Sequence, residues 1–199
     1  MSDVVFIINS MGQGGAQRSV FVLSKEMADR GLQVSILTTD PIPSEYSFPS
    51  NVKLYPLFPL NFGNNIFTKV ALFPYILLKI IVFLRRKRPK YCCSLLTRSN
   101  IFLILSKPFL RKMKIVISER NVTSNIYSSG LSSRIMRAII KITYNYSDKV
   151  ICISKAVKMD LKFFGVDEGK LKVIYNPVFI EKQEKSQKNN QFTFVCVSR

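Results

Sequence analysis

Three short segments of the sequence carry residue types and spacings that could do chemistry. The first is a glycine-rich turn, Gly12–Gly15, which is followed by a helical pattern. The second, Ser118–Asn121, holds the acid Glu119 directly after an apolar run, and the third is Ser154 after another such run. Small residues at the start of a helix leave backbone N–H groups open to an anion such as a phosphate. A carboxylate at the end of a strand could bind a ligand hydroxyl or stabilise charge.

Each segment could also have a purely structural role. The glycine turn could be a tight connection between a strand and a helix, since it matches neither G-x-G-x-x-G, because position 17 is Gln, nor the phosphate-binding G-x-x-x-x-G-K-[ST] pattern. Asn121 is a residue type common in turns, and Ser154 is a good helix N-cap. Glu119 could form a structural ion pair with one of three cations: Arg98, Lys114 or Arg120.

The absence of histidine excludes several kinds of chemistry. It removes Ser-His-Asp and Cys-His catalysis, His-ligated zinc and any histidine general base. No C-x-x-C pair marks a metal or redox site, so we expect neither a metal nor a cofactor. Any reaction must therefore use carboxylates, backbone amides, Arg, Lys, Ser or Tyr, or be completed by groups outside this chain.

The elements that would position these groups alternate between strand and helix. Helical patterns occupy Ala16–Met27, Ile66–Leu84 and the segment from Ser154 to Gly165, and a further helix should bury one face made of Leu131, Ile135, Ala138, Ile139 and Ile142. Strands are predicted at Val4–Ile8, Val34–Leu37, Val52–Tyr55, Tyr91–Leu96, Ile115–Ile117, Val150–Ile153 and Val173–Tyr175. This alternation predicts an α/β fold with an open, doubly wound, mainly parallel Rossmann-like sheet. Ligands bind at the carboxyl ends of such strands, where all three segments would meet and where Arg98 of Thr97–Ser99 could contribute.

Charge is concentrated in one part of the chain, which has a net charge of +18. Between residues 66 and 120 there are 13 basic residues and one acid. The same stretch holds the apolar runs Val70–Leu84 and Ile101–Leu110 and the basic tail Arg85–Lys90. A basic and apolar combination favours an anionic membrane surface over nucleic acid. The alternative is an ordinary buried helix with a solvated basic tail; Pro74 and Lys79 interrupt the run, which is too short to predict a transmembrane span.

The organisation of the chain follows from its composition. Residues 1–177 read as one domain, 178–191 as a polar linker and 192–199 as the first strand of a truncated second domain. The N-terminus lacks the features of a signal peptide. The four cysteines sit in apolar runs where buried free thiols are expected, which indicates a reducing compartment and therefore the cytoplasm.

Four segments, taken in order, resemble glycosyltransferase family 4 enzymes of the GT-B fold and of the bacterial surface-polysaccharide type. They are FIINSMGQGGAQRSVFVLSKEMADRGLQVSILTTD, IVISERN, SDKVICISKAVKMDLKFFGV with KLKVIYNPV, and FTFVCVSR. The resemblance implies that a sugar moves, with retained anomeric configuration, from a nucleotide-sugar to a glycan acceptor carried on a polyprenyl diphosphate. This chain would be the N-terminal, acceptor-binding domain, working as a peripheral protein on the inner face of the cell membrane.

The resemblance also implies roles for individual residues. Glu119 would be catalytic, close to the reacting sugar, and Arg199 would neutralise the donor diphosphate. The cleft that faces donor and acceptor would include Gly14, Gly15, Arg18, Arg120 and Asn121.

Parts of the family pattern are missing from this sequence. The C-terminal domain and its E-x7-E motif are absent, as is the lysine that follows the diphosphate-binding arginine. We therefore expect the chain alone to be inactive, and a second chain could carry the nucleotide-binding half. The alternative is a non-catalytic membrane-surface or scaffold protein that uses only a Rossmann-like domain.

Overall fold

The computed structural model describes residues 2–40, 44–57, 66–110, 113–126 and 130–177. The predicted linker 178–191, the predicted strand 192–199 and Arg199 lie outside this part of the chain, so their roles stay predictions.

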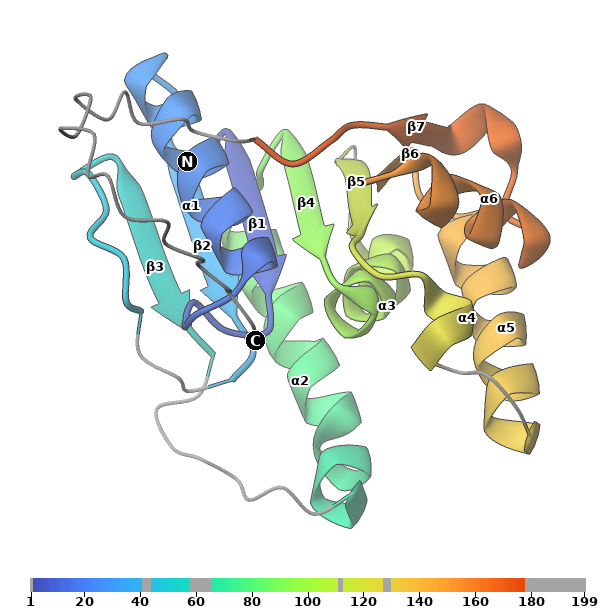
Figure 1. Cartoon of the computed structure of the whole chain (residues 1–199). Coiled ribbons are helices and arrows are strands. Elements are labelled where there is room, and N and C mark those ends of the chain that lie inside the picture. Colours follow the sequence, from blue (N-terminus) through green and yellow to red (C-terminus); the bar gives the residue numbers. More distant parts are fainter. Residues whose placement is uncertain (1, 41–43, 58–65, 111–112, 127–129, 178–199) are drawn as a thin grey trace, which may run out of the picture.

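A seven-stranded sheet forms the centre of the molecule (Figure 1). All its neighbouring strands run parallel, in the order β3-β2-β1-β4-β5-β6-β7. The strands are β1 (Val4–Ile8), β2 (Val34–Thr38), β3 (Val52–Pro56), β4 (Tyr91–Leu95), β5 (Lys114–Glu119), β6 (Lys149–Cys152) and β7 (Leu171–Val173). The predicted fold class is confirmed. The seventh strand ends two residues earlier than predicted, at Val173 instead of Tyr175.

Six α-helices connect the strands within the described residues. They are α1 (Gly15–Asp29), α2 (Ile66–Lys87), α3 (Thr97–Ser106), α4 (Thr123–Ile126), α5 (Gly130–Tyr144) and α6 (Lys155–Phe163), with short 3₁₀ turns η1 (Lys107–Phe109) and η2 (Glu168–Lys170). The sequence patterns did not predict α3. Most of its side chains are buried, so its sequence lacks the alternation between a solvent-exposed face and a buried face that identifies a surface helix.

The direction of the crossovers decides which face each helix covers. The chain moves from β1 towards β3 at first, and then from β4 to β7 in the opposite direction. Because such crossovers are right-handed, α1 lies on one face and the later helices on the other. Val20 of α1 packs in one core cluster, while Ile80 of α2 and Leu161 of α6 share a second. In Figure 1, α1 covers β1 and β2, and no described helix covers β4 and β5 on that side.

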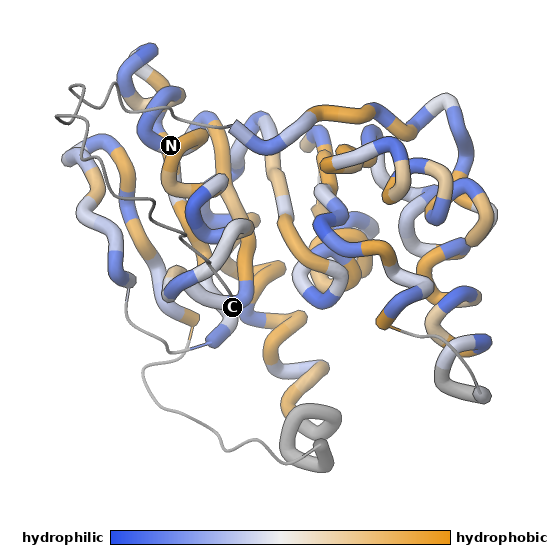
Figure 2. The backbone as a smooth tube through the Cα atoms, in the orientation of Figure 1, coloured by the Kyte–Doolittle hydropathy of each residue, from blue (hydrophilic) through white to orange (hydrophobic). Residues whose placement is uncertain are grey.

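Continuous apolar runs make the central strands stable in this position. Every residue of β1 and of β2 is buried, and the hydropathy colouring of Figure 2 shows the apolar strands and helices facing each other across the core. A parallel sheet covered on both faces requires this composition. The edge strand β3, in contrast, is mostly only half-buried or exposed.

Helix α2 begins at Ile66, continues through Pro74 and ends in a basic last turn, Arg85–Lys87, which is favourable at the negative end of the helix dipole. No helix in the described part of the chain is long and apolar enough to cross a membrane.

The predicted buried face of the fifth helix is wrong for its described side chains; the side chain of Leu131 lies outside the described part of the structure. Ile135 is 51% exposed and Ile142 is 62% exposed, whereas Ile140 and Tyr144 are fully buried. Helix α5 is apolar on two sides, so periodicity alone could not identify the side that meets the core. Contact with α3 decides it, since Asn100 of α3 donates a hydrogen bond to the hydroxyl of Tyr144.

Two positions on α2 test the packing of the helical layer. Ile80 is 0% exposed, and Leu78, two residues away, is 57% exposed. Ile80→Ala should lower the free energy of unfolding by about 2–5 kcal/mol, because it leaves a cavity against the sheet. Leu78→Ala should change it by less than about 0.5 kcal/mol, since that side chain faces solvent. Urea unfolding followed by circular dichroism measures both values, and equal losses would contradict the burial.

Candidate functional site

The carboxyl ends of the strands form one edge of the sheet, at the lower side of Figure 1. The parallel register places the ends of β1, β5 and β6 along this edge, as the sequence predicted for its three segments. The crossovers diverge between β1 and β4, which are neighbours in the sheet. A crevice at such a point is where doubly wound sheets bind ligands.

The glycine turn opens helix α1 at this edge. Gly14 has a positive φ of 154°, which disfavours any residue with a side chain. A Cβ placed on Gly15 would meet no atom within 4 Å, so the backbone there is open. No side chain caps the first turn of α1, and its free N–H groups are therefore available to an anion.

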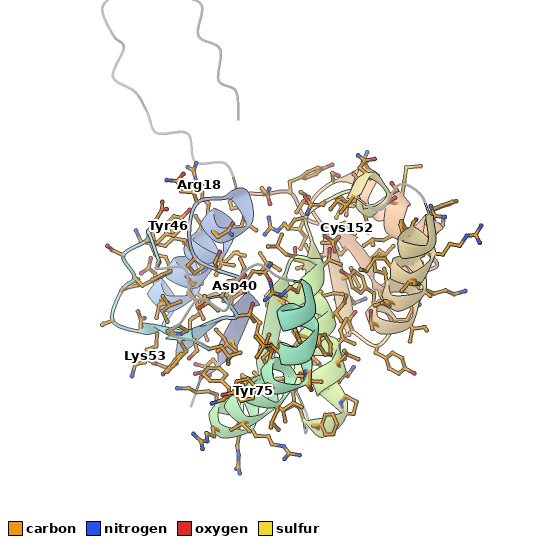
Figure 3. The ribbon with its side chains drawn as sticks, turned by 90° about the horizontal axis from the view of Figure 1, so that it is seen from below. Arg18, Asp40, Tyr46, Lys53, Tyr75 and Cys152 are labelled. Carbon is orange, nitrogen blue, oxygen red and sulfur yellow. The ribbon has the colours of Figure 1, made fainter. Side chains whose placement is uncertain are left out.

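Arg18 lies in the first turn of the same helix. Its backbone N–H donates to the carbonyl of Gly14 at 2.9 Å, which closes the turn. Its side chain is exposed and lies on the outer side of α1 in Figure 3, which looks onto the carboxyl edge. The guanidinium is thus at the edge but directed away from the sheet.

The first turn of α3 joins the loops that follow β1 and β2. Ser99 donates a hydrogen bond of 2.8 Å to the side chain of Asn9, directly after β1. Arg98 pairs with Asp40, beyond the end of β2, at 2.7 Å between Nη2 and Oδ1. Arg98 therefore does lie at the predicted edge, where its charge is balanced by Asp40.

Glu119 lies inside the protein. Its side chain is 0% exposed, so the expectation that its carboxylate lines an open cleft is wrong for this structure. The hydroxyl of Tyr144 donates to Oε2 at 2.6 Å and the hydroxyl of Thr97 to the same oxygen at 3.0 Å. The backbone N–H groups of Arg120 and Asn121 donate to Oε1 at 3.0 and 3.4 Å. The carboxyl group ties β5, α3 and α5 to the loop that follows it.

Burial dominates the ionisation of this group. Desolvation raises the pKa of Glu119 above its ordinary value, although the four donors partly oppose the shift. Burial and the neighbouring Glu119 raise the pKa of Tyr144 well above the ordinary value of a tyrosine. No cation in the described part of the chain forms an ion pair with Glu119, since Arg98 pairs with Asp40 and Lys114 with Asp148.

The period of the strand explains why Glu119 is buried. Ile115, Ile117 and Glu119 lie two residues apart on β5, so all three point to the same face, and the two isoleucines are fully buried there. This alternation is visible in the sequence and could have predicted the inward direction. The role of Tyr144 had no such signal, because it depends on the packing of α5 against β5.

Arg120 points to the opposite face of the sheet. Its guanidinium donates to Ser19 of α1 at 3.0 Å and to Asn176 beyond β7, and its Nε has no partner within the described structure. Partial burial lowers its pKa from the ordinary value of an arginine. The side chain lines a groove of about 180 Å³ over β4–β6, whose other walls include Leu23 and Ile151.

The remaining two predicted site residues are Asn121 and Ser154. Asn121 is exposed directly after the buried carboxyl group, so its amide side chain is accessible to a ligand. Ser154 accepts a hydrogen bond of 3.2 Å from the N–H of Val157 and is the N-cap of α6, the role that the sequence favoured. Of the three residues Glu119, Arg120 and Asn121, only Asn121 is exposed.

The described cysteines are free thiols in or near the core. Cys92 and Cys152 are buried and Cys93 is half-buried. Burial raises the pKa of Cys93 to about 12 and that of Cys152 to about 11, so neither is a thiolate near neutral pH. They pack as small apolar residues.

This fold, with a glycine turn at the switch point of a parallel sheet, is that of a GT-B domain. The family model of Glycosyltransferase Family 4 matches residues 13–182, and the chain belongs to this family. A comparison with curated proteins gave no match.

Solved structures share the fold. The lipopolysaccharide outer core galactosyltransferase WaaB in its apo form is 15% identical, with a TM-score of 0.65 over 90% of this chain and 47% of that chain. Alr3699/HepE of Anabaena, in complex with UDP and glucose, is 15% identical, with a TM-score of 0.59 over 89% and 45%. UDP-N-acetylglucosamine 2-epimerase from Rickettsia bellii is 12% identical, with a TM-score of 0.56 over 88% and 45%. The chain spans less than half the length of each of these proteins.

Replacing the buried carboxyl group gives a prediction with a defined sign. Because the pKa of Glu119 is raised in the folded protein, the folded state keeps a proton that the unfolded chain has already lost. The contribution of this group to stability is complete below about pH 4 and is lost as the pH rises through the raised pKa. Glu119→Gln should abolish that loss. As the pH rises, the free energy of unfolding of the variant should therefore fall less than that of the wild type.

Urea unfolding from about pH 4 to about pH 8 measures the difference. Glu45→Gln, at an exposed glutamate, is the matched control and should follow the wild-type profile. If Glu119→Gln also runs parallel to the wild type, the carboxyl group is not held neutral by burial.

Proposed function

We propose that this chain is the acceptor-binding half of a retaining glycosyltransferase that moves a sugar from a nucleotide-sugar to a lipid-linked glycan in surface polysaccharide synthesis. The observation that carries the proposal is the open backbone of the glycine turn at the switch point of a family 4 sheet. An uncapped helix start attracts the negative charge of a diphosphate, and a glycine lets the ligand approach the backbone closely.

Roles for the site residues follow from where they lie. Gly14, Gly15 and Arg18 would face the donor diphosphate and sugar, and the exposed amide of Asn121 would hydrogen-bond a sugar hydroxyl. Glu119 would act through the loop that it anchors instead of touching the substrate, because its carboxyl group is enclosed by Tyr144 and by its neighbours.

The donor side of the reaction would come from a second half. The chain covers 45–47% of three solved structures that share its fold, one of which holds UDP and glucose. The nucleotide would sit mainly in that second half, as part of the same protein or as a separate chain, and Arg199 would help to neutralise the diphosphate. The 199 residues alone should therefore not transfer sugar.

A membrane site of action is the second part of the proposal. The outer side of α2 exposes Leu78 and Val82 beside the cations Lys79 and Arg86, which suits an anionic bilayer. The basic tail lies at the amino edge of the sheet, since the N–H groups of Lys90 and Tyr91 donate to Asp3, just before β1. A bilayer would therefore lie along the helical layer and would reach both edges, on the cytoplasmic side of the cell membrane.

A non-catalytic scaffold is the alternative function. The burial of Glu119 favours it, because this residue is the one acid between residues 66 and 120. Transfer by the complete reading frame decides between the two. We expect a glycosylated lipid product whose new linkage keeps the anomeric configuration of the donor sugar, as measured by NMR. An inverted linkage contradicts the retaining mechanism, and no transfer from any nucleotide-sugar favours the scaffold.

Gly15→Ala tests the glycine turn. The methyl group would find open space in this chain and alanine favours helices, so the melting temperature should stay the same or rise slightly. In the complete enzyme the same methyl group would stand where the diphosphate approaches. Transfer should then fall by about tenfold or more, equivalent to the loss of one charge-assisted hydrogen bond.

Lys25→Ala is the matched control for this substitution. Lys25 is exposed on the same helix, away from its first turn, so both the melting temperature and transfer should be unchanged. Full activity of Gly15→Ala would show that no ligand approaches the backbone at this turn.

A further inference from the structure

Helix α5 has a second apolar side that no described residue covers. Ile135 and Ile142 are more than half exposed, and they lie seven residues apart, which is two helical turns. They therefore stand above one another on the outer side of the helix, and Ala138 between them is also exposed. Tyr146, just beyond the end of α5, continues the stripe at 64% exposure.

Cations border this stripe on the side of α6. Arg134 and Lys141 are again seven residues apart, and both are exposed. The aliphatic carbons of Lys141 lie beside Gly165, at the end of α6. Neither side chain forms an ion pair within the described part of the chain, and α5 contains no acidic residue. The cations are thus free to meet an external negative charge.

Helix α6 extends the apolar surface. Met159 is 73% exposed and Phe163 is 72% exposed. Phe163 is joined to α5 by Arg137, whose guanidinium lies 5.2 Å from the centre of its ring. Figure 1 shows α4, α5 and α6 together at one end of the sheet. Among the acids nearby, Glu168 pairs with Lys158 and Lys162, while Asp160 accepts the N–H of Ser124 and Asp167 that of Gly169.

We infer that this surface, Ile135, Ile142, Met159 and Phe163 with Arg134 and Lys141, docks on an anionic lipid bilayer. Apolar side chains next to unpaired cations suit the boundary between acyl chains and anionic headgroups. A water-soluble acidic partner would not require large exposed apolar side chains, and an apolar protein partner would not require the unpaired cations. The inference rests on the proposed membrane site of action and adds a surface separate from α2.

The position of the surface fits the carboxyl edge. Helix α6 begins at the N-cap Ser154, directly after the carboxyl end of β6, and α4 follows β5 after a short loop. Ile126 of α4, next to that edge, is 52% exposed. A bilayer in contact with this surface would lie beside the loops that are proposed to bind the acceptor.

Vesicle flotation of the 199-residue chain tests the inference. Phosphatidylcholine vesicles with phosphatidylglycerol should float the chain, and pure phosphatidylcholine vesicles should float much less of it. Ile135→Gln with Ile142→Gln should weaken the partition by about tenfold, and Arg134→Gln with Lys141→Gln by a similar factor. All four positions are exposed and glutamine favours helices, so the circular dichroism melting curve should not change.

Two matched controls separate the contribution of this surface from those of overall charge and of α2. Lys25→Gln with Lys53→Gln removes the same charge at exposed positions on α1 and β3, and should leave flotation unchanged. Leu78→Gln with Val82→Gln tests α2. If the α2 pair abolishes flotation and the α5 pairs do not, the inference is overturned while the proposed membrane site stands. If no vesicle floats the wild type, the inference and the proposed membrane site of action both fail. Failure to detect sugar transfer would contradict the proposed enzyme function but not the membrane contact of either surface.

Self-association is the remaining outcome. Light scattering during size-exclusion chromatography measures the mass of the wild type and of Ile135→Gln with Ile142→Gln. A dimer that this pair converts to a monomer, with unchanged flotation, would assign the surface to a second copy of the chain and overturn the inference.

Discussion

The hydrogen bond from the hydroxyl of Tyr144 to the carboxyl group of Glu119, 2.6 Å long, is the interaction on which the edge of this sheet depends. A carboxyl group enclosed by protein is costly unless its oxygens have partners. Here two hydroxyl groups and two backbone N–H groups, from α5, α3 and the loop after β5, provide them. One buried side chain thus sets the relative position of three elements. The next residue, Arg120, crosses to the other face and meets Ser19 of α1, which attaches the loop to both layers of the molecule.

The two faces of the sheet are covered unequally by helices. Since α1 alone covers its face among the described helices, the apolar groove over β4–β6 is lined on one side by α1 and on another by the residues after β7. The other face has a full layer of helices, whose outer sides carry exposed apolar residues next to exposed cations. These two sides match the two parts of the proposal, a second domain for the face with the groove and a lipid surface for the other.

Much of this architecture was predictable from local patterns. Alternating apolar runs and helical periods identified the parallel sheet, because strands covered on both faces need continuous apolar sequence. The glycine turn and the N-cap Ser154 were equally readable, since backbone conformation and capping depend on a few adjacent residues. The direction of Glu119 was also encoded, in the period of two that it shares with Ile115 and Ile117.

The tertiary structure decided what depends on contacts between distant segments. Helix α5 has apolar residues on two sides, and only its packing against α3 and β5 determines that Tyr144 is buried and that Ile135 is exposed. Helix α3 has no solvent-exposed face, so its sequence shows no amphipathic period that could predict it. By itself the sequence determined the order and type of most elements, because these follow from local composition. The tertiary structure decided which side of each helix meets the core, since burial depends on long-range packing that local periodicity does not record.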